Sequence, residues 1–399
     1  MAVIRPFCAV RPAVEYADKV AALPYDVYNR AEAKKEVERE PLSFLAIDRA
    51  ETQFEDSVSV YAPEVYAKAK ELFEERISQG IFVEDKQSAY YIYQLEMNGR
   101  TQTGIAACAS VDDYLDGTIK KHENTREEKE QDRIRHVDTL SAQTGPIFLA
   151  YRSQATINQL VSEIMETQEP LYDFTAADGI AHRMWKVTEE AVTTLQEAFA
   201  GIQEIYIADG HHRAASAVKV GLKRRKEHPD YDGTEEFNYF LSVLFPDDQL
   251  MIMDYNRCVK DLHGLTKEAF LKAVEECFDV TVLDGAKHPQ AKGQITMYLE
   301  NRWYLLQAKQ ELLAITDPVA ALDVSLLQEY LLKPVLGIED PRTDERIDFI
   351  GGIRGLEELE RRVQTDMTVA FAMYPTSIGE LFAVADAGLL MPPKSTWFE

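Results

Sequence analysis

The stretch Asp209-Gly210-His211-His212-Arg213 constrains the fold and the chemistry of this chain more than any other segment. It follows the apolar run 205–208 and precedes the helix-forming run 214–220, so the pattern predicts a strand, a tight polar turn and a helix. The first turn of a helix carries unpaired N–H groups and a partial positive charge. Gly210 lets a ligand approach the backbone, and the imidazoles and the guanidinium add hydrogen-bond donors. This combination is typical of a phosphate site. The alternative is an ordinary turn in which Arg213 pairs with a surface acid.

The length and charge of the chain narrow the kinds of partner. A chain of 399 residues is long enough for two or three packed units, and 46% apolar and 28% charged residues fit a globular protein. The formal net charge of −25 repels phosphodiester backbones, so we expect no nucleic-acid partner, although a small phosphorylated ligand in a local basic pocket is compatible. No apolar run approaches the ~20 residues that span a bilayer, and no signal peptide is evident. We therefore expect a cytoplasmic protein with no membrane partner; a homo-oligomer is compatible with the sequence.

Strands and helices alternate irregularly along the chain. Asn98-Gly99 lies between two strand-like runs and predicts a tight hairpin. Further hairpins are expected within 237–255 and 296–307, and a short strand within 20–27. Helices are expected at 30–40, 63–79, 153–167, 188–199, 266–277, 323–332 and 377–387. This mixture favours an α+β fold of mixed sheets with hairpins and flanking helices. We expect two parts, 1–265 with the nucleotide-binding or catalytic site and 266–399 as a C-terminal α+β region.

A second polar group, His122-Glu123-Asn124-Thr125, lies on a predicted loop, where catalytic side chains often lie. Glu123 could act as a general base for an alcohol or as a Mg²⁺ ligand, and His122 as a general acid or a phosphate donor. The alternative is a helix start, with Thr125 as N-cap and Glu128 completing a capping box. The charged run 127–135 that follows is expected to be mostly a solvated helix face.

Several common sites are not supported by the sequence. The four cysteines are scattered and form no CxxC pair, which argues against a disulfide framework and a cysteine-based zinc site. His211 and His212 are adjacent rather than four residues apart, as a helical zinc site requires, although assembly with His122 stays open. No phosphate loop of the GxxxxGK[ST] type, no GxGxxG after a strand and no GxSxG is present.

Six segments together resemble the bacterial and archaeal domain-of-unknown-function family numbered 1015, over nearly the whole chain. The segments are Pro6-Phe7 with Arg11-Pro12, Pro24-Tyr25-Asp26-Val27, Pro41-Leu42-Ser43-Phe44-Leu45, His122-Glu123-Asn124-Thr125, Ala208-Asp209-Gly210-His211-His212-Arg213 and Met391-Pro392-Pro393-Lys394-Ser395-Thr396-Trp397-Phe398. The family name implies no function. Because the last motif reaches the end of the given sequence, we expect the natural chain to continue for a few residues.

The turn at 209–213 is also similar to the signature of ParB/sulfiredoxin-like domains, whose turn and arginine bind nucleotide phosphates. One branch of these proteins is the free L-serine kinases. The resemblance implies a ParB/sulfiredoxin-like core, with Asp209 near a metal or the substrate. It also implies a glutamate base upstream of the turn, for which Glu123 is the candidate. The turn has no cysteine, so the sulfiredoxin reaction is not expected. The residues implied to surround nucleotide phosphate are Gly210, His211, His212 and Arg213.

The sequence therefore predicts a small-molecule kinase that uses ATP or ADP with Mg²⁺ and phosphorylates free L-serine to O-phosphoserine. The catalytic residues would be Glu123, His122 and Asp209, with Asp209 as the metal ligand. Acceptor binding is expected from Lys394, Ser395 and Thr396 together with Tyr25 and Asp26. The alternatives are a non-catalytic ParB-like nucleotide-binding regulator, and a nucleotide hydrolase or nuclease on the same fold.

Overall fold

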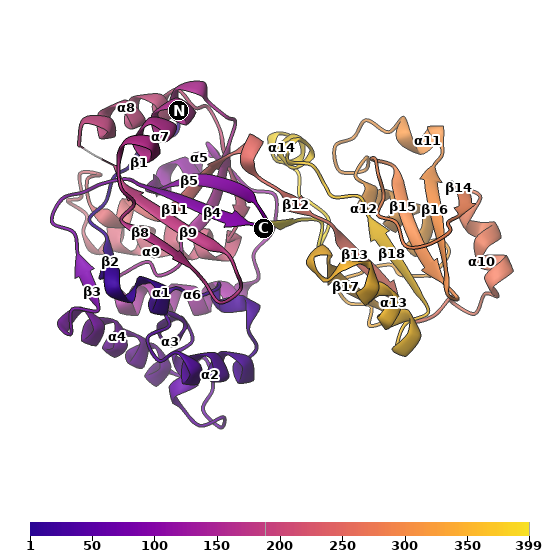
Figure 1. The fold of residues 1–399 in the computed structure, drawn as a ribbon, viewed down its shortest axis with the longest axis horizontal. Helices are drawn as coiled ribbons and strands as arrows, with labels where there is room; N and C mark the ends of the chain where they lie inside the picture. The colour runs from indigo at the N-terminus through magenta and orange to yellow at the C-terminus, as the bar shows by residue number, and fades with distance from the viewer. Residues whose placement is uncertain (188, 399) are drawn as a thin grey trace. The chain divides into compact units, whose positions relative to one another are not determined.

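The chain forms two compact units in a computed structural model that describes residues 1–187 and 189–398. The first unit is Met1–Gln249, and the second begins at Leu250 (Figure 1). The boundary expected at 265/266 falls inside the second unit. Both units mix helices with several β-sheets, which confirms the predicted α+β class.

A nine-stranded mixed sheet forms the centre of the first unit. Its strands follow the order β6-β10-β7-β11-β5-β4-β9-β8, and β1 pairs with β5 outside this path. β10 runs parallel to β6 and antiparallel to β7, so β6 and β10 end at the same edge of the sheet. The strands are β1 (Ile4–Arg5), β4 (Tyr91–Met97), β5 (Arg100–Ser110), β6 (Ile119–Lys120), β7 (Ile147–Tyr151), β8 (Tyr172–Thr175), β9 (Ala181–Lys186), β10 (Ile205–Asp209) and β11 (Tyr239–Pro246).

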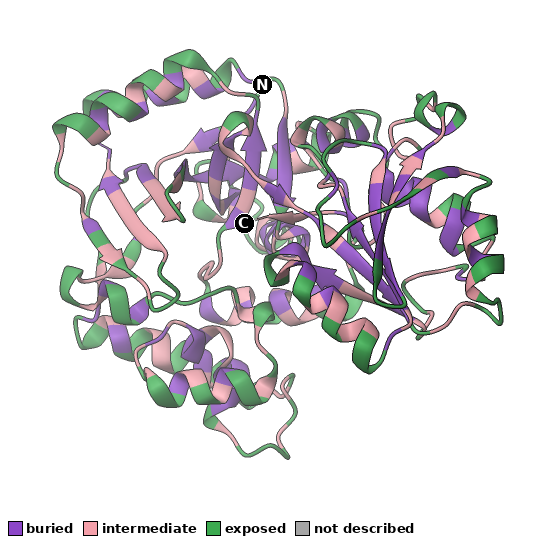
Figure 2. Cartoon of the chain, turned by 45° about the vertical axis from the view of Figure 1, so that its right-hand side comes forward, coloured by how far each residue is buried: buried purple, intermediate pink, exposed green. Residues whose placement is uncertain are grey.

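Three helices share an apolar core with this sheet. Each buries one face, formed by side chains three or four residues apart, as an amphipathic helix does. Figure 2 shows buried strands at the centre of the sheet, whereas β8 and β9 at one edge are only partly buried, and it shows the helices exposed on their outer side. The helices are α7 (Ala155–Thr167), α8 (Glu189–Ala200) and α9 (His211–Glu227), and α5 (Val111–Asp116) follows β5.

A helical layer of the first unit has its own apolar core, to which Ile47, Val65 and Leu140 contribute. α6 (Glu127–Leu140) packs against α4 on one side and α9 on the other. This layer also includes α1 (Ala17–Val20), α2 (Arg30–Arg39), α3 (Leu45–Asp48), α4 (Pro63–Ser78) and the two-stranded sheet of β2 (Val10–Pro12) and β3 (Phe82–Glu84).

The second unit contains a six-stranded antiparallel sheet with the order β14-β16-β15-β18-β13-β17. Its strands are β13 (Tyr255–Val259), β14 (Phe278–Val282), β15 (Gln294–Leu299), β16 (Arg302–Ala308), β17 (Ile347–Gly351) and β18 (Val369–Met373). A separate ribbon pairs β12 (Ile252–Met253) with β19 (Trp397–Phe398). The helices are α10 (Lys267–Val274), α11 (Gln310–Leu313), α12 (Asp323–Leu327), α13 (Gly355–Thr365) and α14 (Ile378–Asp386).

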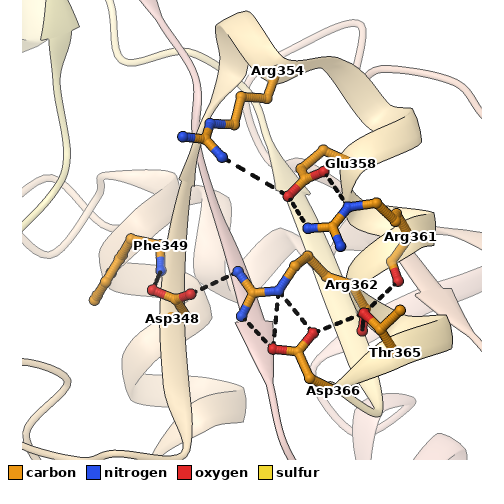
Figure 3. Close-up of polar contacts among 8 residues, drawn as sticks. All are labelled: Asp348, Phe349, Arg354, Glu358, Arg361, Arg362, Thr365 and Asp366. Carbon is orange, nitrogen blue, oxygen red and sulfur yellow. Dashed lines mark hydrogen bonds and ion pairs between the residues drawn. The ribbon is translucent and has the colours of Figure 1, made fainter. Parts of the chain in front are cut away.

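A charged network ties α13 to the sheet of the second unit (Figure 3). Arg362 on α13 donates to Asp348 of β17 at 2.7 Å and to Asp366 at 2.8 Å. Glu358 accepts hydrogen bonds from Nε and Nη2 of Arg361, each at 2.7 Å. The Arg362 side chain is 14% exposed, so its two ion pairs are better shielded from water than that of Arg361, which is 58% exposed.

Two predicted hairpins are confirmed. Asn98 and Gly99 have φ values of 53° and 77°, the left-handed pair that a tight hairpin turn requires, and they connect β4 to β5. Glu300 and Asn301 make the equivalent turn between β15 and β16. The turn at 209–213 also has the predicted strand before it and the predicted helix after it.

Two local predictions were wrong, and a third was incomplete. The hairpin within 237–255 does not form, because β5 and β7 occupy both edges of β11, and β12 pairs with β19 instead. The stretch 20–27 is not a strand: α1 ends at Val20, and Tyr25–Val27 is a 3₁₀ turn. The run 127–135 is mostly solvated, as predicted, but α6 also lies between two helices and buries Glu130 and Arg133. The first residue of the helix predicted at 188–199 lies outside the described residues.

Candidate functional site

The turn at 209–213 joins the end of β10 to the start of α9. The pairing of β10 with β7 shifts register between Ile207 and Asp209, a bulge of the kind that often aims side chains at sites. Gly210 is the N-cap of α9 at φ +89°, a conformation that favours glycine, and it makes no side-chain capping bond. A Cβ at this position would lie 2.9 Å from Nε of Arg213. The first N–H groups of this 17-residue helix are therefore not capped by a side chain, as an anion site requires.

Arg213 is anchored by groups on either side of it. Its Nη2 donates to Oδ2 of Asp209 at 2.8 Å, and its Nη1 donates to the carbonyl of Pro146 at 2.5 Å. The Arg213 side chain is 17% exposed, whereas that of Asp209 is 62% exposed. The pairing with an acid that the sequence offered as an alternative is therefore present, and the acid belongs to the same turn. An anionic ligand would meet a guanidinium that is already oriented.

The first histidine of the turn is buried against the loop that follows β6. The ring centroids of His211 and His122 lie 4.5 Å apart in an edge-to-face arrangement, and both side chains are buried. The backbone N–H of His122 donates to Nε2 of His211 at 3.4 Å, which makes Nε2 an acceptor and leaves the proton on Nδ1. That Nδ1 lies 3.7 Å from Oε2 of Glu123. The Glu123 side chain is 60% exposed, so its carboxylate is accessible to a substrate.

Burial keeps both rings of this histidine pair neutral. It lowers the pKa of His122 to about 4. Burial and the neighbouring His122 hold the pKa of His211 well below its ordinary value. A neutral His122 is a poor proton donor near neutral pH, which argues against the general-acid role considered for it.

The second histidine ties the loop after β6 to α9. Nε2 of His212 accepts the backbone N–H of Arg126 at 2.9 Å. Thr125 donates to Glu130 at 2.8 Å, and Glu130 pairs with Lys219 of α9. Thr125 is therefore not the N-cap of α6; that position is Arg126, which makes no side-chain capping bond.

Tyr25 and Asp26 line a cavity of about 220 Å³. The guanidinium of Arg133 lies 4.1 Å from the centroid of the Tyr25 ring. Burial raises the pKa of Tyr25 to about 12, against the lowering effect of the Arg133 and Arg213 charges. The charge of Asp26 likewise acts to raise the pKa of His212, although burial lowers it overall. Both residues therefore lie within electrostatic range of the turn.

Several residues of this cavity were missed by the sequence analysis. Oδ1 of Asp48 lies 3.4 Å from Nε2 of His136 and accepts the hydroxyl of Thr144 at 2.6 Å. Burial opposes ionisation of Asp48, but the contact with His136 and the charge of Arg133 outweigh it and lower the pKa of Asp48. The available signal was spacing: the cavity residues of α6 recur at i, i+3, i+4 and i+7, which is one face of a helix, and they are Lys129, Asp132, Arg133 and His136.

Lys394, Ser395 and Thr396 belong to the second unit. The ammonium group of Lys394 lies 5.4 Å from the centroid of the Tyr255 ring. The hydroxyl of Ser395 donates to the carbonyl of Pro392 at 2.6 Å, and Ser395 is buried. The role of the three residues in acceptor binding stays a prediction.

The turn fits a magnesium ion that is held mainly by the nucleotide. Within the described residues there is no group of three or more His, Cys, Asp or Glu side chains that could hold a metal. Mg²⁺ needs only one or two carboxylates when phosphate oxygens and waters complete its shell. Asp209 is exposed, and the bond to Arg213 involves only its Oδ2.

The fold and the site define an α+β protein in which a helix N-terminus suited to an anion lies beside a histidine–carboxylate pair. The chain belongs to the family described as protein of unknown function DUF1015, whose model matches residues 4–325. No curated protein matches. Within the described residues, no helix is both long and apolar enough to cross a bilayer.

Several solved structures are similar over about three quarters of the chain. A free serine kinase in complex with AMP is 16% identical, with a TM-score of 0.36, over 74% of this chain and 87% of that chain. A conserved hypothetical protein from Pyrococcus furiosus is 15% identical, with a TM-score of 0.34, over 74% and 90%. SbnI with a C-terminal truncation, from Staphylococcus aureus, is 12% identical, with a TM-score of 0.38, over 74% and 82%.

Proposed function

We propose that this protein is a kinase that transfers a phosphoryl group from ATP or ADP to the hydroxyl of free L-serine, with Mg²⁺. The observation that carries the proposal is the position of Glu123. Its carboxylate is exposed and lies 3.7 Å from Nδ1 of His211, the first residue of α9. A base for an alcohol thus lies beside a helix N-terminus suited to phosphate, which are two requirements of phosphoryl transfer. The choice of L-serine comes from the resemblance of the turn to those of the free L-serine kinases.

The nucleotide phosphates would accept hydrogen bonds from the uncapped N–H groups at the start of α9 and from the guanidinium of Arg213. Asp209 would contribute a carboxylate oxygen to Mg²⁺, which would neutralise charge on the phosphate oxygens. These contacts would hold the terminal phosphorus in line with the attacking hydroxyl.

Glu123 would accept the proton of the serine hydroxyl while the oxygen of that hydroxyl forms a bond to the terminal phosphorus. The bridging P–O bond would break, and the nucleotide would leave with one phosphate fewer. Nδ1–H of neutral His211 would donate to the Glu123 carboxylate and hold it in position. His122 would act as a positioning residue, because its backbone N–H sets the tautomer of His211.

Full-length protein incubated with Mg²⁺, L-serine and either ATP or ADP should form O-phosphoserine, measured by phosphorus NMR. Glu123→Gln should lower the rate at least about 100-fold, as loss of a general base does, with nucleotide affinity nearly unchanged. Glu127→Gln is the matched control, because Glu127 is an exposed acid on α6.

Each alternative gives a different result in this experiment. Nucleotide binding without a phosphorylated acceptor would reject the kinase and favour the regulator. Release of inorganic phosphate without an acceptor would favour a hydrolase. Wild-type turnover by Glu123→Gln would remove Glu123 from the mechanism.

A further inference from the structure

The cavity lined by Tyr25 and Asp26 is small, and its lining combines charged side chains with apolar ones such as Val60 and Val65. Its volume of about 220 Å³ is below the range of pockets that take drug-sized ligands. Tyr61 and Tyr66 of the α4 region and Lys129 of α6 contribute to its lining. A cavity of this size suits a metabolite of a few heavy atoms.

Most charged side chains of this cavity are already paired with one another. Asp48 contacts His136, and Arg133 pairs with Asp132 at 2.8 Å. Arg49 binds Glu51 at 2.5 Å. Arg49 also donates to the carbonyl oxygens of Tyr25 and Tyr28 at 2.9 and 2.7 Å. Because these groups satisfy each other, they can shape the cavity without a net demand for a charged ligand.

Two charged side chains of the lining do not take part in these pairs. Asp26 and Lys129 are both exposed, and neither has an ion-pair or side-chain hydrogen-bond partner among the described residues. They come from different segments: Asp26 from the 3₁₀ turn Tyr25–Val27, and Lys129 from the first turn of α6. The cavity therefore offers one unpaired carboxylate and one unpaired ammonium group.

Both groups lie within electrostatic range of His212 in the turn. The pKa of His212, which burial lowers, is also affected by the charges of Lys129 and Asp26. Nε2 of His212 accepts the N–H of Arg126, which stands one helical turn before Lys129. A small molecule bound by Asp26 and Lys129 would thus lie within reach of the proposed phosphate site.

We propose that this cavity is the acceptor site and that Asp26 and Lys129 select a zwitterion. The ammonium group of an α-amino acid would pair with Asp26, and its carboxylate with Lys129. This inference rests on the proposed function for the identity of the acceptor. Exposed ion pairs contribute about 1 kcal/mol or less each, so removing either charge should change the affinity by about fivefold at most.

Three probes that differ by one charged group test the assignment in the full-length protein. L-serine carries both charges, ethanolamine lacks the carboxylate, and L-glycerate, which has the same configuration as L-serine, carries a hydroxyl in place of the ammonium group. Calorimetry without nucleotide, where no phosphoryl transfer can occur, should show the wild type preferring L-serine over either analogue, by up to about fivefold. Lys129→Gln should abolish the preference over ethanolamine only, and Asp26→Asn the preference over L-glycerate only. Arg135→Gln, an exposed cation of α6 outside the lining, should keep both preferences.

The result separates this inference from the kinase proposal. Equal affinity of the wild type for the three probes, no saturable binding of L-serine, or unchanged preferences in both variants would overturn the zwitterion site. If the preferences appear as expected but no O-phosphoserine forms, the site stands and the kinase proposal fails. If O-phosphoserine forms while both variants keep the wild-type preferences, the kinase stands and the acceptor lies elsewhere.

Discussion

The backbone N–H of His122 donates to Nε2 of His211, and the two buried rings meet edge to face with centroids 4.5 Å apart. The two residues are 89 positions apart in the sequence. They meet because β6 and β10 are parallel neighbours, so the loop after one strand lies beside the turn after the other. The contact between the two histidines positions the exposed side chain of Glu123, which follows His122 in the chain, beside His211.

Acid should destabilise the first unit through His122. Burial lowers its folded pKa to about 4, whereas the unfolded value is 6.5, so the unfolded chain binds more protons between these values. Stability is therefore fully present above pH 6.5 and falls as the pH drops towards 4, by about 3 kcal/mol at most. Urea unfolding of wild type and His122→Phe across this range measures the difference. Parallel curves for the two proteins would contradict the assignment.

Gly210→Ala should weaken nucleotide binding and destabilise the turn by 1 kcal/mol or more, to order of magnitude. The new Cβ would be strained at φ +89° and would lie 2.9 Å from Nε of Arg213. Calorimetry with ADP and thermal unfolding measure the two effects. Gly285→Ala is the control, because its Cβ would have no atom within 4 Å and its φ is not positive. Equal affinities in both variants would remove Gly210 from the phosphate site.

Arg213→Ala should lower nucleotide affinity by about 10- to 100-fold, as loss of one charge-assisted contact does. The Arg213 side chain is anchored to Asp209 and to Pro146. Neither of these partners depends on Arg213 for its own burial, so the substitution should not unfold the turn. We therefore expect turnover to be abolished, as in Asp209→Asn, with a melting temperature within a few degrees of the wild type. Normal turnover in both variants would exclude the turn from the mechanism.

Asp323 should make the second unit less stable as the pH rises. Burial raises its pKa to about 7, despite the N–H of Gly293 that both its oxygens accept at 2.9 and 3.0 Å. The folded state holds the proton more tightly, so its contribution to stability is present below pH 3.8 and is lost as the pH rises to about 7. Asp323→Asn should become more stable relative to the wild type over this window. A constant difference between pH 4 and 7 would refute the raised pKa.

Arg362→Ala should destabilise the second unit by about 1–2 kcal/mol, because it leaves two acids without their shared partner (Figure 3). Arg354→Ala is the control: that side chain is 68% exposed and lies 4.0 Å from Glu358, so a change under about 0.5 kcal/mol is expected. Chemical denaturation compares them. Equal losses would show that the bonds to Asp348 and Asp366 add nothing to stability.

The sequence alone was sufficient where the signal is local. The turn at 209–213 and the hairpin at Asn98-Gly99 form as predicted, because left-handed backbone and helix starts depend on the residues that occupy them. The same reasoning failed at 237–255, where strand pairing across the sheet excluded the local hairpin. It was incomplete along α6, where the burial of Glu130 and Arg133 came from packing against α4 and α9 rather than from the composition of the helix.

The motif itself determined that a glycine-capped helix with two histidines and an arginine would follow a buried strand. Only the tertiary structure decided which groups face that helix. The parallel pairing of β6 with β10 brings Glu123 and His122 to His211, and the packing of α6 brings Lys129 and Asp26 to a common cavity. These contacts join residues far apart in the chain, and the energy that selects them is the burial of the sheet and helix faces as a whole.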